Sequence, residues 1–366
     1  MEGNSAARTQ SLPGVDIIVP CYNYGRFLRA CIGSVLDQPG CQVRALIIDD
    51  CSTDDSLDIA HAIAAEDPRV QVLAHTMNRG HIATYNEGID WLASEYMLLL
   101  SSDDMLAPGA LGRALDLMEA ERSISFVYGP AIQFSHGTDL ATQLSRRLPP
   151  SGRGGLVRGP DFIRRLCTKP VNPIETATAV VRTSLQKRVG GYRPELPHSG
   201  DLEMWLRLAA YGDVGEIPEV QAFTRIHAHN MRHGYTADRV RADYEQRHRA
   251  FRIFFENQSE RLENAERLAR LAHRSLAEEV LWAAARHFEE AEEDAATVRL
   301  MDLAPTIDGT IRWTPLWWKT WVKRALGPQR WQALAPVIAV LKRMPLLRAS
   351  GERATAAGGR SRDMLR

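Results

Sequence analysis

Four short apolar runs, each followed by a stretch with helical spacing, constrain the fold of this chain more than any other feature. The apolar runs predict buried strands, and they lie at residues 15–19, 43–48, 70–74 and 96–100. The helical stretches lie at residues 27–36, 55–65, 82–93 and 110–120. Strands that alternate with helices in this way form an α/β domain whose mainly parallel sheet is flanked by helices.

Polar residues follow three of these predicted strands, at residues 21–23, 49–54 and 101–104. In open α/β sheets, ligands bind outside the carboxyl ends of the strands, so we expect the ligand site there. The pairs Asp49-Asp50 and Asp103-Asp104 would repel each other at one sheet edge unless a cation offset their charge. Mg²⁺ or Mn²⁺, held by one or two carboxylates and by substrate phosphates, fits this pattern. The alternative is that these aspartates only form turns and helix caps.

Two classes of function are disfavoured by what the sequence lacks. Neither GxxxxGK[ST] nor GxGxxG follows the first predicted strand, which argues against P-loop and dinucleotide-binding folds. A phosphate group would therefore be held by a metal ion and side chains. The chain has 45 Lys and Arg residues against 45 Asp and Glu residues, and this zero net charge argues against nucleic acid as a partner.

Seven motifs, in order along the chain, resemble those of glycosyltransferase family 2, which has the GT-A fold. The first four are VDIIVPCYNYGRFLRACIGSVLDQ (15–38), ALIIDDCSTDDS (45–56), NRGHIATYNEGI (78–89) and YMLLLSSDDMLAPGAL (96–111). The last three are VGGYRPEL (189–196), GDLEMWLRLA (200–209) and TRIHAHNM (224–231). The resemblance implies a Rossmann-like sheet of the GT-A type, an inverting transfer reaction and a nucleotide-sugar donor, with a UDP-sugar expected.

The resemblance also implies which residues bind the donor. They are Pro20, Tyr22, Asn23, Asp50, Asn78, Gly80, Ser102, Arg207 and Arg225. Asp50 would accept a hydrogen bond from the nucleobase, in a pocket completed by Pro20, Tyr22 and Asn23. Asn78 and Gly80 would approach the ribose and the diphosphate. The two arginines would contact the diphosphate or the metal.

A divalent metal, Mn²⁺ or Mg²⁺, would be bound by Asp103, Asp104 and His227, and Asp201 would be the catalytic base. Two positions depart from the family's pattern. Ser101 stands where the family often has Asp, although a serine can still bind a metal through water. Gly200 replaces the Glu of the usual Glu-Asp pair, so Glu203 is the candidate for the supporting carboxylate.

These residue types suit the transfer of a sugar to a hydroxyl group. An acceptor hydroxyl is a poor nucleophile until a carboxylate takes its proton. The leaving nucleoside diphosphate needs a divalent cation and Arg or His donors to offset its charge. We therefore expect a glycosyltransferase of surface polysaccharide or glycolipid biosynthesis, with a glycan or lipid-linked acceptor. The alternatives are a non-catalytic nucleotide-sugar-binding protein of the same fold and a nucleotidyltransferase. The latter would carry a triphosphate loop near the N-terminus, which we do not find.

Two further segments invite an interpretation. Residues 133–159 are rich in Gly, Ser, Pro and Arg, which predicts a loop that could close over a substrate. His227, His229 and His233 could suggest zinc, but no cysteine or carboxylate lies at a helpful spacing. We therefore favour His227 as a contact of the diphosphate or of its metal.

The distribution of charge and tryptophan sets the C-terminal part apart. Residues 309–366 contain twelve basic and two acidic residues, a net charge of +10 against −10 for the remainder. Five of the eight tryptophans lie in residues 313–331, and Trp317, Trp318, Trp321, Val322 and Ala325 share one predicted helical face. A basic amphipathic helix with interfacial Trp is typical of an anionic membrane surface. The alternative is that these tryptophans pack on the catalytic domain.

The expected organisation follows from these shifts in composition. We expect a flexible tail, a catalytic domain of the GT-A type, a helical extension, a basic Trp-rich amphipathic segment and a disordered tail, at residues 1–14, 15–232, 233–308, 309–348 and 349–366. The N-terminus lacks the apolar core of a secretory signal. We expect a cytoplasmic protein, with the basic segment able to hold it on the inner face of the plasma membrane.

Overall fold

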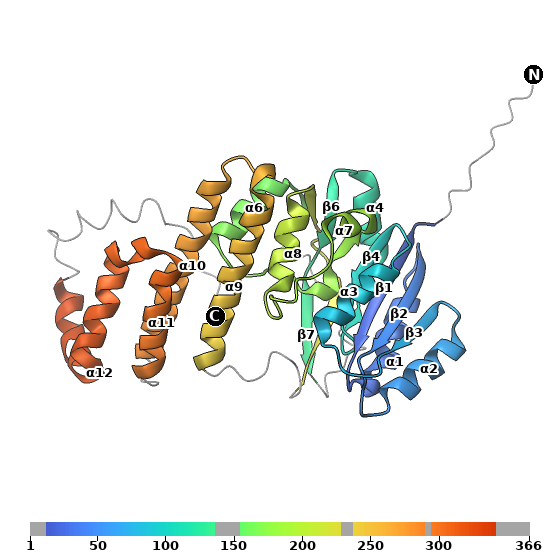
Figure 1. The fold of residues 1–366 in the computed structure, drawn as a ribbon, viewed down its shortest axis with the longest axis horizontal. Helices are drawn as coiled ribbons and strands as arrows, with labels where there is room; N and C mark the ends of the chain where they lie inside the picture. The colour runs from blue at the N-terminus through green and yellow to red at the C-terminus, as the bar shows by residue number, and fades with distance from the viewer. Residues whose placement is uncertain (1–11, 136–153, 228–236, 290–293, 342–366) are drawn as a thin grey trace, which may run out of the picture. The chain divides into compact units, whose positions relative to one another are not determined.

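The computed structural model describes residues 12–135, 154–227, 237–289 and 294–341 (Figure 1). The expected tails, most of residues 133–159, and His229 and His233 lie wholly or largely outside these ranges. The chain divides into two compact units, Met1–Ser275 and Leu276–Arg366. The first unit holds two sheets, an eight-stranded one and a three-stranded one.

The first half of the large sheet is parallel, as the sequence predicted. Its strands are β1 (Gly14–Cys21), β2 (Gln42–Asp49), β3 (Val70–Ala74) and β4 (Tyr96–Leu99). The helices between and after them are α1 (Gly25–Leu36), α2 (Ser56–Glu66), α3 (His81–Trp91) and α4 (Ala110–Ala120). Strand β1 lies between β2 and β4, and residues 15–19 are fully buried because both faces of the sheet are covered.

The second half of the large sheet mixes directions, which the sequence did not predict. The strands concerned are β6 (Ile124–Tyr128), β8 (Gly155–Val157), β9 (Val180–Arg182) and β10 (Asp213–Glu216). Strand β9 runs antiparallel between β4 and β6, so the full order is β3-β2-β1-β4-β9-β6-β10-β8. The helices of this half are α6 (Gly159–Thr168), the 3₁₀ turn η1 (Thr176–Thr178), α7 (Thr183–Val189) and α8 (Gly200–Ala209).

A small second sheet carries part of the candidate site. Its strands, in the order β5-β11-β7, are β5 (Met105–Leu106), β11 (Ala222–Ile226) and β7 (Ala131–Ser135). The expectation of a loop over residues 133–159 is therefore wrong at both ends. Strand β7 pairs with β11, and β8 pairs with β10, so partners distant in sequence decide the local structure there.

A buried carboxylate ties the parallel strands to the turn before β4. Asp16 lies on β1 and forms a bidentate ion pair with Arg44 of β2, with both N–O distances 2.8 Å. It also accepts hydrogen bonds from the amide groups of Ala93 and Ser94. Burial by itself would raise the pKa of Asp16, but these hydrogen bonds lower it below its usual value. The charge is thus satisfied inside an apolar strand.

The C-terminal part is helical, as predicted, with a different division from the expected one. Its helices are α9 (Ala237–Gln258), the 3₁₀ turn η2 (Ser259–Arg261), α10 (Ala265–Glu289), α11 (Asp294–Ile307), the 3₁₀ turn η3 (Gly309–Trp313) and α12 (Pro315–Leu341). Helix α9 belongs to the first unit, because Phe251 and Phe254 share the core that contains Trp205 of α8. Helix α12 bends at Gly327, whose φ is 76°. In the described part of the chain, no helix is both long and apolar enough to span a bilayer.

The close approach of α3 to β1 yields a stability test. A Cβ atom on Gly88 would lie 2.3 Å from Cγ2 of Ile18. We expect Gly88→Ala to lower the free energy of unfolding by about 1–3 kcal/mol, because the packed strand gives little room. Urea denaturation followed by circular dichroism measures the change.

A glycine on another helix is the matched control. On α1, a Cβ atom on Gly33 would meet no atom within 4 Å. Gly33→Ala should therefore raise stability by about 0.5–1 kcal/mol through helix propensity alone. Equal unfolding midpoints for the two variants would contradict the packing of α3 on β1.

Candidate active site

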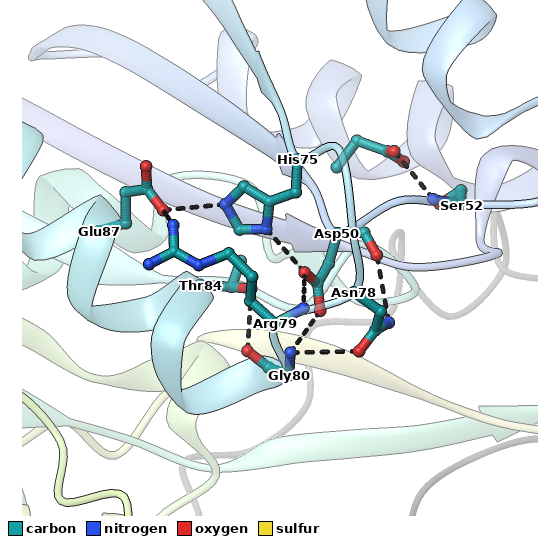
Figure 2. Close-up of polar contacts among 9 residues, drawn as sticks. Asp50, Ser52, His75, Asn78, Arg79, Gly80, Thr84 and Glu87 are labelled. Carbon is teal, nitrogen blue, oxygen red and sulfur yellow. Dashed lines mark hydrogen bonds and ion pairs between the residues drawn. The ribbon is translucent and has the colours of Figure 1, made fainter.

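The carboxylate of Asp50, at the end of β2, organises the edge of the sheet (Figure 2). Its Oδ1 accepts hydrogen bonds from Nδ1 of His75 at 2.6 Å and from the amide of Arg79 at 2.7 Å. Its Oδ2 accepts from the amide of Gly80 at 2.8 Å. Burial tends to raise the pKa of Asp50, but the bonds from Arg79, His75 and Gly80 bring it below its usual value. Asp50 therefore holds the segment between β3 and α3 in place.

His75 extends this arrangement to helix α3. Its side chain is 4% exposed, and its Nε2 lies 2.9 Å from Oε2 of Glu87. The same carboxylate accepts a hydrogen bond from the guanidinium of Arg79 at 2.6 Å. Neither His75 nor Glu87 was among the residues predicted from the sequence. His75 directly follows the strand 70–74, so the rule that singled out the other strand ends could have found it.

Asn23 and Asn78, both predicted to bind the nucleotide-sugar donor, form hydrogen bonds with neighbouring loops of the protein. Oδ1 of Asn23 accepts a hydrogen bond from the backbone N–H of Thr53 at 2.7 Å. The backbone N–H of Asn23 donates to the hydroxyl of Ser52. Asn23 has a φ of 60°, a left-handed conformation that Asn tolerates. The side chain of Asn78 donates to the carbonyl of Asp50. The structure thus brings these residues to one edge but commits their side chains to the fold.

Tyr22, Pro20 and Ser102 differ in their accessibility at this edge. The side chain of Tyr22 is exposed, and Pro20 is half-buried at the end of β1. Ser102 is fully buried, and its hydroxyl has no hydrogen-bond partner among the described residues. A direct donor contact for Ser102 therefore disagrees with the structure, because its side chain lies beneath the surface of the site.

The predicted metal motif meets the predicted Arg-x-His element. Asp103 and Asp104 directly precede β5, which pairs antiparallel with β11, and β11 carries Arg225 and leads to His227. Nε2 of His227 lies 3.0 Å from Oδ2 of Asp103. The amide of Arg225 donates to Oδ1 of Asp104 at 2.9 Å, and its side chain donates to the carbonyl of Asp103. The pairing of β5 with β11 explains why residues more than 120 positions apart meet.

Aromatic rings fix the cationic side chains of this group. The guanidinium of Arg225 lies 4.4 Å from the ring centroids of both Phe27 and Phe134. The ring of His227 lies 5.2 Å from that of Tyr24 and 5.1 Å from that of Phe27. Burial, together with Asp103 and Asp104, raises the pKa of Tyr24 to about 12, so its phenol stays protonated at neutral pH.

The side chains available as ligands determine whether a metal ion fits here. Asp103 and His227 supply one carboxylate and one imidazole, while Ser101 donates a hydrogen bond to Asp103 and Arg225 donates to Asp104. The described residues contain no group of three or more His, Cys, Asp or Glu side chains able to hold a metal by themselves. Mg²⁺ and Mn²⁺ often take only one or two protein carboxylates and complete their coordination with phosphate oxygens and water. The residues fit a metal that binds together with a diphosphate.

The predicted base, Asp201, acts electrostatically on the same tyrosine as Asp103 and Asp104. Asp201, in the first turn of α8, accepts a hydrogen bond from the hydroxyl of Thr176 at 2.9 Å. Burial raises the pKa of Tyr85, and the charges of Asp201, Asp103 and Asp104 raise it further. One phenol therefore lies within electrostatic reach of all three carboxylates. Tyr85 lies in the motif at residues 78–89, but no role was predicted for it from the sequence.

Arg207 does not lie where a diphosphate contact requires it. Its guanidinium is buried, forms a 2.6 Å ion pair with Glu203 and donates to the carbonyls of Val189 and Gly191. Glu203 also receives a bond from Arg193. The side chains of Arg207 and Glu203 thus hold the loop 189–193 against α8. These contacts argue against the expected diphosphate contact of Arg207 and against a supporting role of Glu203 beside Asp201.

A pocket of about 660 Å³ adjoins the Asp50 network. It is lined from α3 and the preceding segment by Arg79, Gly80, Asn86 and Glu87, among others, and from the loop before α8 by Pro194 and Pro197. Gly80 and Glu87 belong to both the network and the pocket. The contacts that order the sheet edge therefore also shape one wall of this cavity.

Comparisons with known proteins identify a family and several relatives. Residues 16–187 match the model of the family Glycosyl transferase family 2. An uncharacterized glycosyltransferase of Haemophilus influenzae is 34% identical over 108 residues, which are 30% of this chain and 43% of the relative. A chondroitin synthase of Escherichia coli is 32% identical over 123 residues, which are 34% of this chain and 18% of the relative. The chain thus spans less than half the length of these two relatives.

The fold extends the likeness beyond the matched residues. The structure of S. aureus TarS 1-349 in complex with UDP-GlcNAc has a TM-score of 0.60 to this one, with 17% sequence identity and coverage of 80% of each chain. Asp201, Arg225 and His227 lie beyond the residues that the family model matches. The ordered motifs and the family match together assign residues 16–187 to glycosyltransferase family 2, and the chain has the GT-A fold.

Proposed function

We propose that this protein is an inverting, metal-dependent glycosyltransferase that moves a sugar from a nucleotide-sugar donor to a hydroxyl group of a glycan or lipid-linked acceptor. One observation carries the proposal. Asp103 and Asp104 precede β5 and lie against the end of β11, where Nε2 of His227 is 3.0 Å from Oδ2 of Asp103 and the amide of Arg225 is 2.9 Å from Oδ1 of Asp104. Carboxylates beside an arginine and a histidine at this sheet edge suit a diphosphate and its metal, and Asp201, in the first turn of α8, would be the base.

The donor of this proposal is a UDP-sugar. TarS has been solved with UDP-GlcNAc and with UDP, which supports a uridine nucleotide as the donor's nucleotide here. The exposed ring of Tyr22 offers a face for the nucleobase. Asp50, Asn78 and Gly80 would act mainly through the backbone that they order. Arg225 would add positive charge near the diphosphate.

The reaction follows from the residue types. Asp201 takes the proton of the acceptor hydroxyl, which then attacks the anomeric carbon as the bond to the diphosphate breaks. The proton ends on the carboxylate of Asp201, and the negative charge ends on the departing nucleoside diphosphate. Asp103 and His227 would hold the divalent ion, with Asp104 close by, and the bound ion would supply charge that offsets the developing negative charge.

The biological setting is also a proposal. The chondroitin synthase among the relatives supports the synthesis of a polysaccharide or glycolipid of the cell surface. We place the enzyme in the cytoplasm, at the inner face of the plasma membrane, where a lipid-linked acceptor would meet it. A non-catalytic nucleotide-sugar-binding protein remains the alternative that Ser101 and Gly200 suggest. A nucleotidyltransferase would need a triphosphate loop, for which the sequence offers no candidate.

Removal of the base tests the catalytic assignment. Asp201→Asn keeps the shape and loses the proton acceptor, so we expect transfer to slow by about 10²–10⁴-fold. Binding of UDP, measured by calorimetry, should stay within about twofold of the parent value because Asp201 contacts the acceptor side. Asp116→Asn, an exposed carboxylate on α4, is the matched control and should leave the rate unchanged. An unchanged rate in Asp201→Asn would exclude Asp201 as the base.

The metal site has its own test. Asp103→Asn, or chelation of divalent cations, should abolish transfer and weaken UDP binding by about tenfold or more, because the diphosphate loses its counter-charge. Titration of UDP with and without Mn²⁺ measures this effect, and Asp116→Asn again serves as the control. If UDP binding by the parent protein does not depend on Mn²⁺ or Mg²⁺, a metal-dependent mechanism is wrong.

Asp50 makes a prediction about pH. Because the pKa of Asp50 is lowered in the folded state, its contribution to stability is present above the unfolded value of about 3.9 and is lost as pH falls through the lower folded value. Asp50→Asn should destabilise the protein by about 1–3 kcal/mol at pH 7, with a difference that shrinks below about pH 4. Urea denaturation across this range measures it. A pH-independent difference would mean that the charge of Asp50 contributes nothing.

A further inference from the structure

The first half of helix α12 exposes an apolar stripe. Trp318, Trp321, Val322 and Ala325 follow the i, i+3, i+4, i+7 spacing of one helical face, and all four are exposed. The indole rings of Trp318 and Trp321 are 52% and 46% exposed, and their centroids lie 5.9 Å apart. We call these four residues the tryptophan face.

The opposite side of the same helix is packed. Thr320 and Lys323 are buried, and the Lys323 ammonium lies 5.2 Å from the centroid of the Trp331 ring. Ile311, in the turn η3 before the helix, is fully buried. The helix therefore already has a buried side, and the exposed tryptophans are on the other side of a folded element. Large apolar side chains gathered at one exposed place mark an interaction surface more often than scattered ones do.

Basic residues surround the tryptophan face. At 100° per residue, Lys319 and Arg324 lie on its two flanks, and both are exposed. Arg312 and Arg330 are exposed near the two ends of this half of the helix. The sequence has no Asp or Glu between Gly309 and Gly351. A partner that fits this surface must therefore be apolar where it meets the indoles and negatively charged around them.

We propose that the tryptophan face binds the surface of an anionic phospholipid bilayer, with α12 lying in the plane of the interface. Indole rings favour the boundary between headgroups and acyl chains because one end is polar and the rest is apolar. Lysine and arginine beside them bind anionic headgroups. The helix is not long and apolar enough to cross the bilayer. This proposal deepens the membrane setting of the proposed function but does not depend on the sugar-transfer chemistry.

Other occupants fit less well. In a two-fold dimer through this face, a second copy would bring the same positively charged segment to it, and like charges repel. Nucleic acid would satisfy the charge but would leave the apolar stripe of Trp318, Trp321 and Val322 without a matching surface. An anionic bilayer satisfies both properties at once.

Vesicle flotation of the full-length protein, without donor or acceptor, tests the proposal. We expect binding to vesicles that contain phosphatidylglycerol, and at least tenfold weaker binding to vesicles of phosphatidylcholine alone. The double variant Trp318→Ser/Trp321→Ser should lose most of the binding. Arg312→Glu/Arg324→Glu should lose well over tenfold, since each basic residue near an anionic surface contributes roughly fivefold. Tryptophan fluorescence of the parent should shift to the blue on binding.

Matched variants in the first unit are the controls. Leu156→Ser removes an exposed apolar side chain, and Arg249→Glu reverses an exposed charge, so neither should change flotation. Equal binding to both kinds of vesicle, no binding to either, or full binding by the tryptophan variant would overturn the proposal. Loss of a dimer in the tryptophan variant, seen by light scattering, would assign the face to a second copy instead. UDP binding by each variant reports the donor site separately, so failure here leaves the enzymatic proposal intact.

Discussion

Accommodation of the Asp50 carboxylate at the end of β2 is the constraint on which the candidate donor site depends. Three hydrogen bonds reach it, from the side chain of His75 and from the amides of Arg79 and Gly80. A buried carboxylate without such donors would be costly, so the chain after β3 must fold back over β2 to supply them. The other ring nitrogen of His75 contacts Glu87, and this contact holds the first turns of α3 in place. The sheet edge, the start of α3 and one pocket wall are therefore one connected structure.

A second constraint joins the metal motif to its cationic neighbours. The pairing of β5 with β11 places Arg225 and His227 beside Asp103 and Asp104, and the rings of Phe27 and Phe134 hold the guanidinium in position. The folded protein thus already holds positive charge at this site, and both carboxylates already have hydrogen-bond partners. This arrangement would suit a metal ion that enters together with a diphosphate, as the proposed function requires.

Much of the catalytic unit was predictable because its signals are local. The strand at 70–74 and the helix at 110–120 have the predicted bounds, since apolar periodicity and the polar residues at their ends mark them. Strand β9 was not predictable, because three residues between α6 and α7 gain their conformation only by pairing with β4 and β6. Arg207 looked like a ligand contact because its motif is polar, yet Glu203 one helical turn earlier draws its guanidinium into the core.

By itself, the sequence determined the alternation of strands and helices, the acidic strand ends, the family and the basic tryptophan-rich segment. These properties follow from the order and spacing of residues along the chain. Only the tertiary structure decided which polar side chains remain accessible. Four of the predicted side chains form hydrogen bonds within the protein, namely Asn23, Asp50, Asn78 and Arg207. By contrast, Tyr22 stays exposed, and the charges of three carboxylates act on Tyr85. The reason is physical, since buried polar groups must find partners within hydrogen-bonding distance, and the folded chain alone determines which groups come that close.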